Sequence, residues 1–253
     1  MNGVNNKTDY TTTTVLLEND LDFAGLSDRF VPSGTTKADY FLGSLDGQGH
    51  TISNLNFKGS TIRFVGFIGY SNGMTIRNLV MDDSCSFESS YNVTEELSYP
   101  YVAGIIGACL SYERPCYIES SVNMASVLYS GEAKNDVFLA GIAAKLESYE
   151  YEVAIKNCAN YGEIKSIGKG TYINLGGIAG IISEGTRPIQ NCINYGEIVN
   201  QGTTTDDIRV GGIVGIAAVG NSSVDNCVSA GKITSTQQTS VASFGGFPLS
   251  MGT

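Results

Sequence analysis

The sequence contains no tryptophan, a single histidine and only 5 prolines among its 253 residues. Charged residues make up 16% of the chain, which is low for a globular domain. No run of about 20 apolar residues is present, so no stretch has the length of a membrane-spanning helix. His50 has no second histidine to work with, which disfavours a histidine-based catalytic centre and a histidine-rich metal site.

Basic residues are also scarce. Lys and Arg number 15 against 25 Asp and Glu, which gives a formal net charge of −10 and an isoelectric point near 4.5. Nucleic acids and anionic membranes both attract basic surfaces, so we expect neither as a partner, and we expect no insertion into a membrane. The acidic residues are dispersed along the chain, as in a surface that serves solubility.

The first residues, MNGVNNKTDYTTTT, are polar and lack the apolar stretch of a signal peptide. The last repeat unit, at Phe244–Phe247, breaks off soon after it begins. We therefore expect a segment of a longer protein, in which case the missing signal peptide does not indicate a compartment.

Glycine is abundant, at 31 residues, and it recurs at a slowly changing interval. A glycine lies in each of the phrases VGFIG, VAGIIG, LAGIAA, LGGIAG, VGGIVG and FGGF. These glycines are spaced by 38, 37, 36, 35 and 34 residues: Gly66, Gly104, Gly141, Gly177, Gly212 and Gly246. A period of this size indicates a solenoid, in which each unit buries its apolar face against the next copy.

A second phrase follows each glycine phrase. It has the form Ile-x-Asn followed by Leu or Cys, and the later copies extend to NCANYGEI and NCINYGEI. The asparagine copies that we align are Asn54, Asn78, Asn157, Asn191 and Asn226, with Ser120 in the third unit. Stacked amides can hydrogen-bond to one another, so this position predicts an asparagine ladder along the stack, broken at Ser120.

The repeat predicts an all-β parallel β-helix with coils of about 34–38 residues. No helical stripe of apolar residues is sustained, and β-branched residues and glycines dominate the repeating phrases. We expect three short strands per coil, a rise of about 4.8 Å between coils, and length variation confined to one turn. Residues 1–40 form a lead-in with the first strands, and residues 41–253 form one continuous solenoid with an incomplete last coil.

The six cysteines divide into two kinds. Cys158, Cys192 and Cys227 share one repeat position with Leu55 and Leu79, which predicts buried free thiols. Cys85 shares another repeat position with Val127, Ile164, Ile198 and Ile233, so we expect it to point inward as well.

Cys109 and Cys116 instead flank a variable turn. A disulfide that closes this turn is a plausible alternative to two free thiols, and it would require an oxidising compartment. No Cys-x-x-Cys pair indicates a metal site.

Carboxylates offer little catalytic pattern. The pairs Asp82/Asp83 and Asp206/Asp207 are adjacent in sequence, so their side chains point to opposite faces of a strand. Glu163 and Glu197 recur one coil apart and predict an outward row, with Lys232 as a partner in the next copy.

Two further surface features are candidates for modification or contact. Three Asn-x-Ser/Thr sequons occur at positions that we expect to be loops or lead-in, and they are possible N-glycosylation sites: Asn6, Asn92 and Asn221. Tyrosines gather around the third and fourth units, where they predict a contact surface for glycans or proteins: Tyr91, Tyr99, Tyr101, Tyr112, Tyr149 and Tyr151.

Four phrases in a fixed order carry a resemblance to a known family. FLGSLDGQGHTISNLNF, VGFIG with TIRNL, the VGGIVG copies and the NCxNYGEI copies, preceded by LLENDLDF, resemble the GLUG-motif repeat proteins. The resemblance covers nearly the whole chain. It implies a right-handed β-helix in a secreted or surface protein, as in stalks, in adhesin-like regions and beside the catalytic domains of some surface proteases. It supplies no catalytic residues.

The sequence thus predicts a non-enzymatic, extracellular, adhesin-like β-solenoid that serves as a stalk or a fibre-forming segment. It needs no cofactor and no metal. Its expected partners are further copies, stacked head to tail into a filament, or glycans and proteins of a cell surface. A polysaccharide-active β-helix enzyme, of lyase or glycosidase type, and a glycan-binding module are the alternatives.

Overall fold

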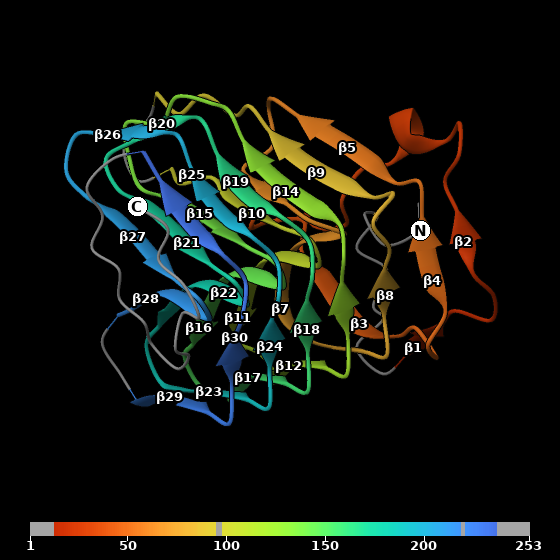
Figure 1. Cartoon of the computed structure of the whole chain (residues 1–253). Helices are drawn as coiled ribbons and strands as arrows, with labels where there is room; N and C mark the ends of the chain where they lie inside the picture. Colours follow the sequence, from red (N-terminus) through yellow and green to blue (C-terminus); the bar gives the residue numbers. More distant parts are fainter. Residues whose placement is uncertain (1–12, 95–97, 219–220, 237–253) are drawn as a thin grey trace.

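The structure is a computed structural model that describes residues 13–94, 98–218 and 221–236. In these residues the chain is nearly all β-structure, with one short 3₁₀ helix at Ser27–Arg29. The ladders between strands are parallel, so each strand pairs with strands about one repeat away and not with its neighbours in sequence. The predicted all-β class is confirmed, and Figure 1 shows the coils following one another from the red N-terminal end to the blue C-terminal end.

A representative coil contains five strand segments, where the repeat pattern predicts three. They are β10 (Tyr101–Ala103), β11 (Ile106–Ser111), β12 (Cys116–Glu119), β13 (Val122–Asn123) and β14 (Ser126–Tyr129). The next strand, β15 (Val137–Ala140), begins the following coil directly beside β10. Two-residue strands such as β13 are too short to show an alternating pattern, which is why the sequence does not reveal them.

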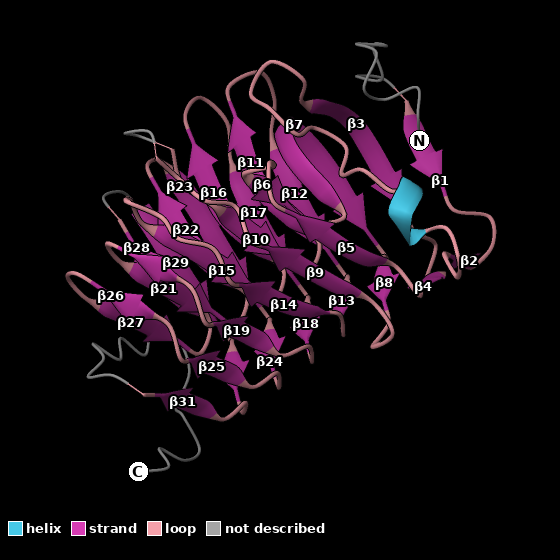
Figure 2. Cartoon of the chain, turned by 90° about the horizontal axis from the view of Figure 1, so that it is seen from above, coloured by secondary structure: helices cyan, strands magenta, loops and turns pink. Residues whose placement is uncertain are grey.

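Equivalent strands of successive coils form the sheets (Figures 1 and 2). The 11-stranded sheet has two arms joined by the long strand β7 (Ile68–Arg77), which pairs with β11 through its first half and with β12 through its second half. Its other strands are β1 (Thr14–Leu16), β3 (Phe41–Asp46), β16 (Ala143–Ser148), β17 (Val153–Lys156), β22 (Ala179–Ser183), β23 (Thr186–Gln190), β28 (Val214–Ala217) and β29 (Asn221–Asp225).

The remaining sheets have 7, 6, 5 and 2 strands. The first contains β2 (Leu21–Asp22), β4 (Thr51–Ser53), β8 (Val80–Met81), β13, β18 (Ala159–Asn160), β24 (Ile193–Asn194) and β30 (Val228–Ser229). The second contains β5 (Asn56–Gly59), β9 (Ser86–Ser89), β14, β19 (Ile164–Ser166), β25 (Ile198–Asn200) and β31 (Ile233–Ser235). The third contains β6 (Phe64–Val65), β10, β15, β21 (Ile173–Gly176) and β27 (Ile208–Gly211), and the smallest contains β20 (Lys169–Gly170) and β26 (Thr203–Thr204).

The core consists of apolar rows that run along the stack. Ile76, Ile118, Ile155 and Ile189 occupy the same place in four successive coils, and each is fully buried. Each coil therefore covers the apolar face of the coil before it, which is the reason for the repeat.

The first coil corrects the predicted alignment. Leu45, not Ile52, pairs with Ile76, while Ile52 pairs with Met81. The phrase at Ile52–Asn54 thus belongs to the next corner of the coil, and Leu55 does not share a position with the cysteines. Phrase similarity misled the alignment because two different corners of the coil both begin with an isoleucine and an asparagine.

The aligned asparagines form a corner more than a ladder. Asn78, Asn157, Asn191 and Asn226 all adopt positive φ angles between 52° and 56°. Asparagine tolerates this left-handed conformation better than most residues do. Ser120 takes the same conformation with φ 49°, so the turn continues through the unit where a break was predicted. Only one amide pair of this column bonds in the described residues, Asn191 Nδ2 to Asn157 Oδ1 at 3.1 Å.

The asparagine ladder lies three residues further along the repeat. Asn123 donates to Asn160 and Asn160 donates to Asn194, both through Nδ2 to Oδ1 at 2.8 Å. Each amide also donates to a carbonyl two residues later, and all three side chains are fully buried. A buried amide without partners is costly, so this row is stable only because each member has a neighbour to bond.

The repeating glycines lie against the asparagine side chains of this row. A Cβ placed on Gly104 would lie 2.1 Å from Oδ1 of Asn123, and one on Gly141 would lie 2.2 Å from Cγ of Asn160. Gly177 has the same relation to Asn194. The glycine phrase is therefore required by space, because the amide of the same coil occupies the position of the missing side chain.

A disulfide joins Cys109 of β11 to Cys116 of β12, and both residues are fully buried. In the next coil their pairing partners are Leu146 and Val153. The crosslink thus occupies an inward site that two aliphatic side chains fill one coil later. Cys158 and Cys192 are buried free thiols and Cys227 is a half-buried one.

Loop length varies at two corners of the coil, where one was predicted. The first corner lies between β11 and β12 and holds residues 112–115, and the equivalent corner in the preceding coil has no loop because β7 continues through it. The second lies between β14 and β15, and its counterpart between β9 and β10 is longer. These two corners carry most of the side chains that are free to differ from coil to coil.

We predict that Asn160→Ala lowers the free energy of unfolding by about 2–3 kcal/mol, because it removes the two hydrogen bonds that this amide donates and the one that it accepts from Asn123. Urea unfolding with an unchanged m-value measures the effect. Gln201→Ala, at an exposed amide, is the control and should change little. Equal stabilities of the two variants would contradict the role of the ladder.

We predict that reduction of the disulfide lowers stability by about 2 kcal/mol, because the crosslink restricts the unfolded chain. The matched control is the double variant Cys109→Leu/Cys116→Val, which adopts the residues of the next coil and should unfold at the same urea concentration with and without reductant. Thiol labelling followed by mass spectrometry checks the bond directly. Labelling of both cysteines in the folded, unreduced protein would contradict it.

Candidate functional site

The predicted tyrosine surface is present in part. Tyr112, Tyr149 and Tyr151 lie in the loops that follow β11 and β16, and they are 44%, 39% and 41% exposed. The rings of Tyr112 and Tyr149 stack on each other with centroids 3.7 Å apart. These three residues form an exposed aromatic patch at one variable corner.

Tyr101 does not belong to that surface. It is 4% exposed, and its ring lies between those of Phe64 and Phe138, with centroids at 5.5 and 5.3 Å. The three rings come from paired strands of successive coils, so they stack at the inter-strand spacing. Tyr101 therefore packs in a second hydrophobic cluster, and its predicted contact role is wrong because a tyrosine on a strand can face a neighbouring sheet as readily as solvent.

Tyr99 and Tyr91 are both half-buried. The ring of Tyr99 leans on those of Tyr101 and Phe138. Tyr91 lies on the other variable corner, where its hydroxyl is 3.4 Å from Oγ of Ser98. Apart from the buried Tyr101, the predicted tyrosines are thus divided between two corners and do not form one surface.

An ion pair borders the aromatic patch. Lys145 Nζ lies 2.8 Å from Glu147 Oε2, with side chains that are 18% and 11% exposed. Burial raises the pKa of Tyr70 to about 12, and it also raises the pKa of Tyr149, with hydrogen bonds to Tyr112 and Glu147 acting in the same direction. These tyrosines are therefore neutral hydrogen-bonding groups near pH 7.

The paired aspartates do not converge on a site. The carboxylate of Asp82 accepts from the backbone N–H and the hydroxyl of Ser84, and that of Asp207 accepts from the N–H of Ile208 at 2.8 Å. Both are engaged in their own turns. Asp136 is the acidic residue with the clearest upward pKa shift, which is caused by burial and opposed by Arg209. In the described part of the chain, no three His, Cys, Asp or Glu residues come together in a metal-binding group.

A groove of about 640 Å³ lies at the second variable corner. Its walls come from short segments in four successive coils. The lining residues are Asn92, Val93, Thr94, Glu132, Ala133, Lys134, Lys169, Gly170, Thr171, Thr203, Thr204 and Thr205. The two-stranded sheet of β20 and β26 and the bridges Val93–Ala133 and Glu132–Lys169 hold these segments in register.

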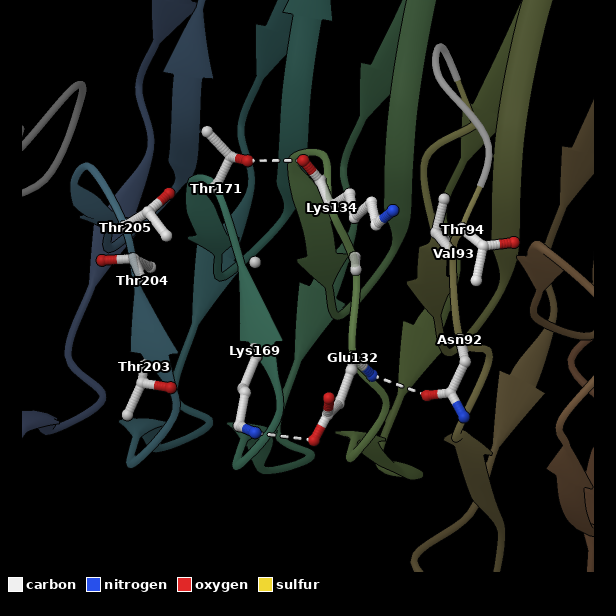
Figure 3. A pocket seen from close by; sticks show the side chains of 12 residues that line it. Asn92, Val93, Thr94, Glu132, Lys134, Lys169, Thr171, Thr203, Thr204 and Thr205 are labelled. Carbon is white, nitrogen blue, oxygen red and sulfur yellow. Dashed lines mark hydrogen bonds and ion pairs between the residues drawn. The ribbon is translucent and has the colours of Figure 1, made fainter.

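Figure 3 shows the side chains of the groove in two rows. One row contains Asn92, Glu132, Lys169 and Thr203, and the other contains Thr94, Lys134, Thr171 and Thr205. The middle residue of each three-residue segment forms the floor, which is small at Ala133 and Gly170. A channel that runs along the solenoid axis results, with hydroxyl, amide, ammonium and carboxylate groups on its rims.

Hydrogen bonds across coils fix the rims. Asn92 Oδ1 accepts from the N–H of Glu132 at 2.8 Å, and Lys169 Nζ lies 2.7 Å from Glu132 Oε1. The hydroxyl of Thr171 donates to the carbonyl of Lys134 at 2.6 Å. These bonds hold the polar rims in place without a ligand.

The sequence did not single out most of these residues. Segments of the form polar-x-polar recur at the coil period, as in Glu132-Ala-Lys134 and Lys169-Gly-Thr171. That signal is detectable only after the coils have been aligned in three dimensions. The exposed pair Tyr161 and Tyr195, whose rings stack at 5.3 Å, was missed for the same reason, although both lie in the repeated NYGEI phrase.

The sequons have different settings. Asn92 is exposed on the rim of the groove. Asn221 is the first residue of strand β29, not part of a loop as predicted. Asn6 lies outside the described residues.

Comparisons with known proteins are sparse. No protein-family model matches the chain, and no curated protein matches it. The resemblance to GLUG-motif repeats therefore stays a prediction. Among the described residues, no helix is long and apolar enough to cross a membrane.

One similar solved structure is a putative immunoglobulin A1 protease from Bacteroides ovatus. The two have 20% sequence identity and a TM-score of 0.62, and the match covers 91% of this chain and 73% of that one. Likeness at this level shows the fold and not the activity. The chain therefore shares with this bacterial protein an all-β architecture of stacked parallel strands.

Proposed function

We propose that the chain is a non-enzymatic, adhesin-like segment of an extracellular protein, a right-handed parallel β-helix with coils of about 34–38 residues. Its role is to hold other parts of that protein, or a binding surface of its own, at a fixed distance on a rigid support. The proposal covers a stalk and a fibre-forming segment alike.

The observation that carries the proposal is the pairing of surface side chains between coils. Lys58 bonds Glu88 at 3.0 Å, and Lys232 lies 3.8 Å from Glu197, as the outward row predicts. Tyr161 and Tyr195 add a stacked pair. Each exposed pair stabilises little by itself, but together they connect successive coils on the outside while the apolar rows connect them inside.

Two further observations support an extracellular setting. The Cys109–Cys116 disulfide suits an oxidising compartment. The similar bacterial structure has a protease name, and the family resemblance places such repeats beside catalytic domains of surface proteases. Both are consistent with a chain that supports a neighbouring domain and leaves the chemistry to it.

We predict that the purified chain forms filaments at high concentration. In the described residues β27 and β31 are each the last strand of their sheet, and a second copy stacked head to tail would pair with such strands. Negative-stain electron microscopy over a concentration series checks this. Monodisperse short rods at every concentration would rule out the fibre-forming role and would still allow the stalk role.

We predict that the chain releases no products from acidic or neutral polysaccharides. In the described residues the two buried carboxylates, Asp46 and Glu147, are bound to Arg77 and Lys145, and Glu132 of the groove is bound to Lys169. These ion pairs hold the carboxylates ionised, whereas a glycosidase needs one of its two carboxyl groups as an acid. Chromatography and mass spectrometry of the incubated polysaccharides provide the measurement. Product release that disappears in Glu147→Gln but persists in Glu113→Gln would replace the proposal with the enzyme alternative.

A further inference from the structure

We infer that the groove at the second variable corner binds an extended neutral polysaccharide lying along the solenoid axis. The inference rests on the proposed adhesin-like function and names its ligand class and its site. It moves the expected contact from the exposed tyrosines to a row of hydroxyl groups that the sequence did not single out.

The chemistry of the rims matches that of a sugar chain. Thr94, Thr203 and Thr205 offer hydroxyl groups that can both donate and accept, and Asn92 adds an amide. The hydroxyl of Thr171 can accept, because its hydrogen is donated to the carbonyl of Lys134. Sugar hydroxyls have the same dual character. Ligand sites generally place a few such polar groups around a concave surface, as this groove does.

The spacing of the rims also favours a chain molecule. Successive members of each row come from successive coils, so they are about 4.8 Å apart and the four-membered row spans about 14 Å. A polysaccharide with equatorial linkages presents hydroxyls at a repeat close to this spacing. One rim residue per sugar unit could therefore bond along the whole length of the groove.

Small residues form the floor between the rims. Gly170 and Ala133 lie there. A Cβ on Gly170 would be 2.9 Å from the side chain of the buried Val137, so the floor at this point packs directly against the core.

An extended peptide fits less well, because the backbone of the groove segments is already bonded. The N–H of Ala133 donates to Lys169 O at 2.9 Å, and that of Lys169 donates to Gly131 O at 2.9 Å. The N–H of Thr203 donates to Gly168 O at 3.0 Å. These N–H groups are therefore not available to a peptide lying along the groove, and the rims present polar side chains where peptide side chains require apolar pockets.

The charge of the protein favours a neutral ligand. The net charge of −10 repels polyanions at long range. Within the groove Lys169 is paired with Glu132, so Lys134 is the rim cation that no ion pair of the described residues engages. A single exposed ammonium does not offset the charge of the whole chain.

The test uses the whole chain produced without glycosylation, so that Asn92 is unmodified. Binding of cellohexaose, xylohexaose and chitohexaose is measured by titration calorimetry and by NMR line broadening, with polygalacturonate oligosaccharides as the acidic comparison. At least one neutral oligosaccharide should bind, and the acidic set should bind more weakly.

The triple variant Thr171→Val/Thr203→Val/Thr205→Val replaces hydroxyls with methyl groups of similar size. We expect its Kd to rise at least about tenfold, because several hydrogen bonds are lost. Thr234→Val, at a half-buried threonine of β31, is the matched control and should leave the Kd unchanged. Thermal melts show whether the variants fold, and Lys134→Met gives a second groove variant if the triple variant does not.

The remaining outcomes separate this inference from the proposed function. Absence of neutral glycan binding overturns the inference that the groove is a binding site, and the adhesin-like role still stands. The same holds if binding is lost in Tyr112→Ala/Tyr149→Ala and kept in the groove variants. Cleavage of the oligosaccharide overturns the proposed non-enzymatic role, while the inference that the groove binds a glycan still stands. Stronger binding of the acidic set, lost in Lys134→Met, or capture of peptides alone overturns the ligand class.

Discussion

The contact between a glycine and an asparagine of the same coil organises this molecule. The amides of Asn123, Asn160 and Asn194 lie in the interior, where water cannot satisfy them, so each must bond a copy of itself one coil away. The amide in turn occupies the space of a side chain, which only glycine lacks. The repeated glycine and the buried asparagine, two visible features of the repeat, both follow from this contact.

Much of the architecture could be predicted because it depends on a period. The glycines recur along the chain as the coils do, and burial of Ile118 or Ile155 follows from that recurrence. The strand class, the parallel pairing and the inward position of Cys158 need no knowledge of which residues touch. They require only that equivalent residues of successive coils stack on one another.

The errors have a common physical origin. An asparagine that turns a corner and an asparagine that bonds inside the coil are identical in sequence, so Asn157 was assigned the role that belongs to Asn160. Likewise Tyr101 and Tyr112 lie in similar surroundings along the chain, yet one faces a neighbouring sheet and the other faces solvent. The groove was missed because Glu132 and Lys169 become neighbours only through stacking. The local sequence pattern specifies the fold of one coil, whereas the surface features depend on which residues of successive coils become neighbours.

The buried amide row also has a direction. Asn123 donates to Asn160 and Asn160 to Asn194, so the dipoles of the row are aligned. The row begins beside Met81, whose side chain has no N–H to donate to Asn123 Oδ1, and it reaches Ser229 at the other end. Between Asn123 and Asn194 any coil could be copied or deleted and its neighbours would still meet an identical amide. This part of the chain can therefore gain or lose whole coils in evolution without a change in the hydrogen bonding of the amide row.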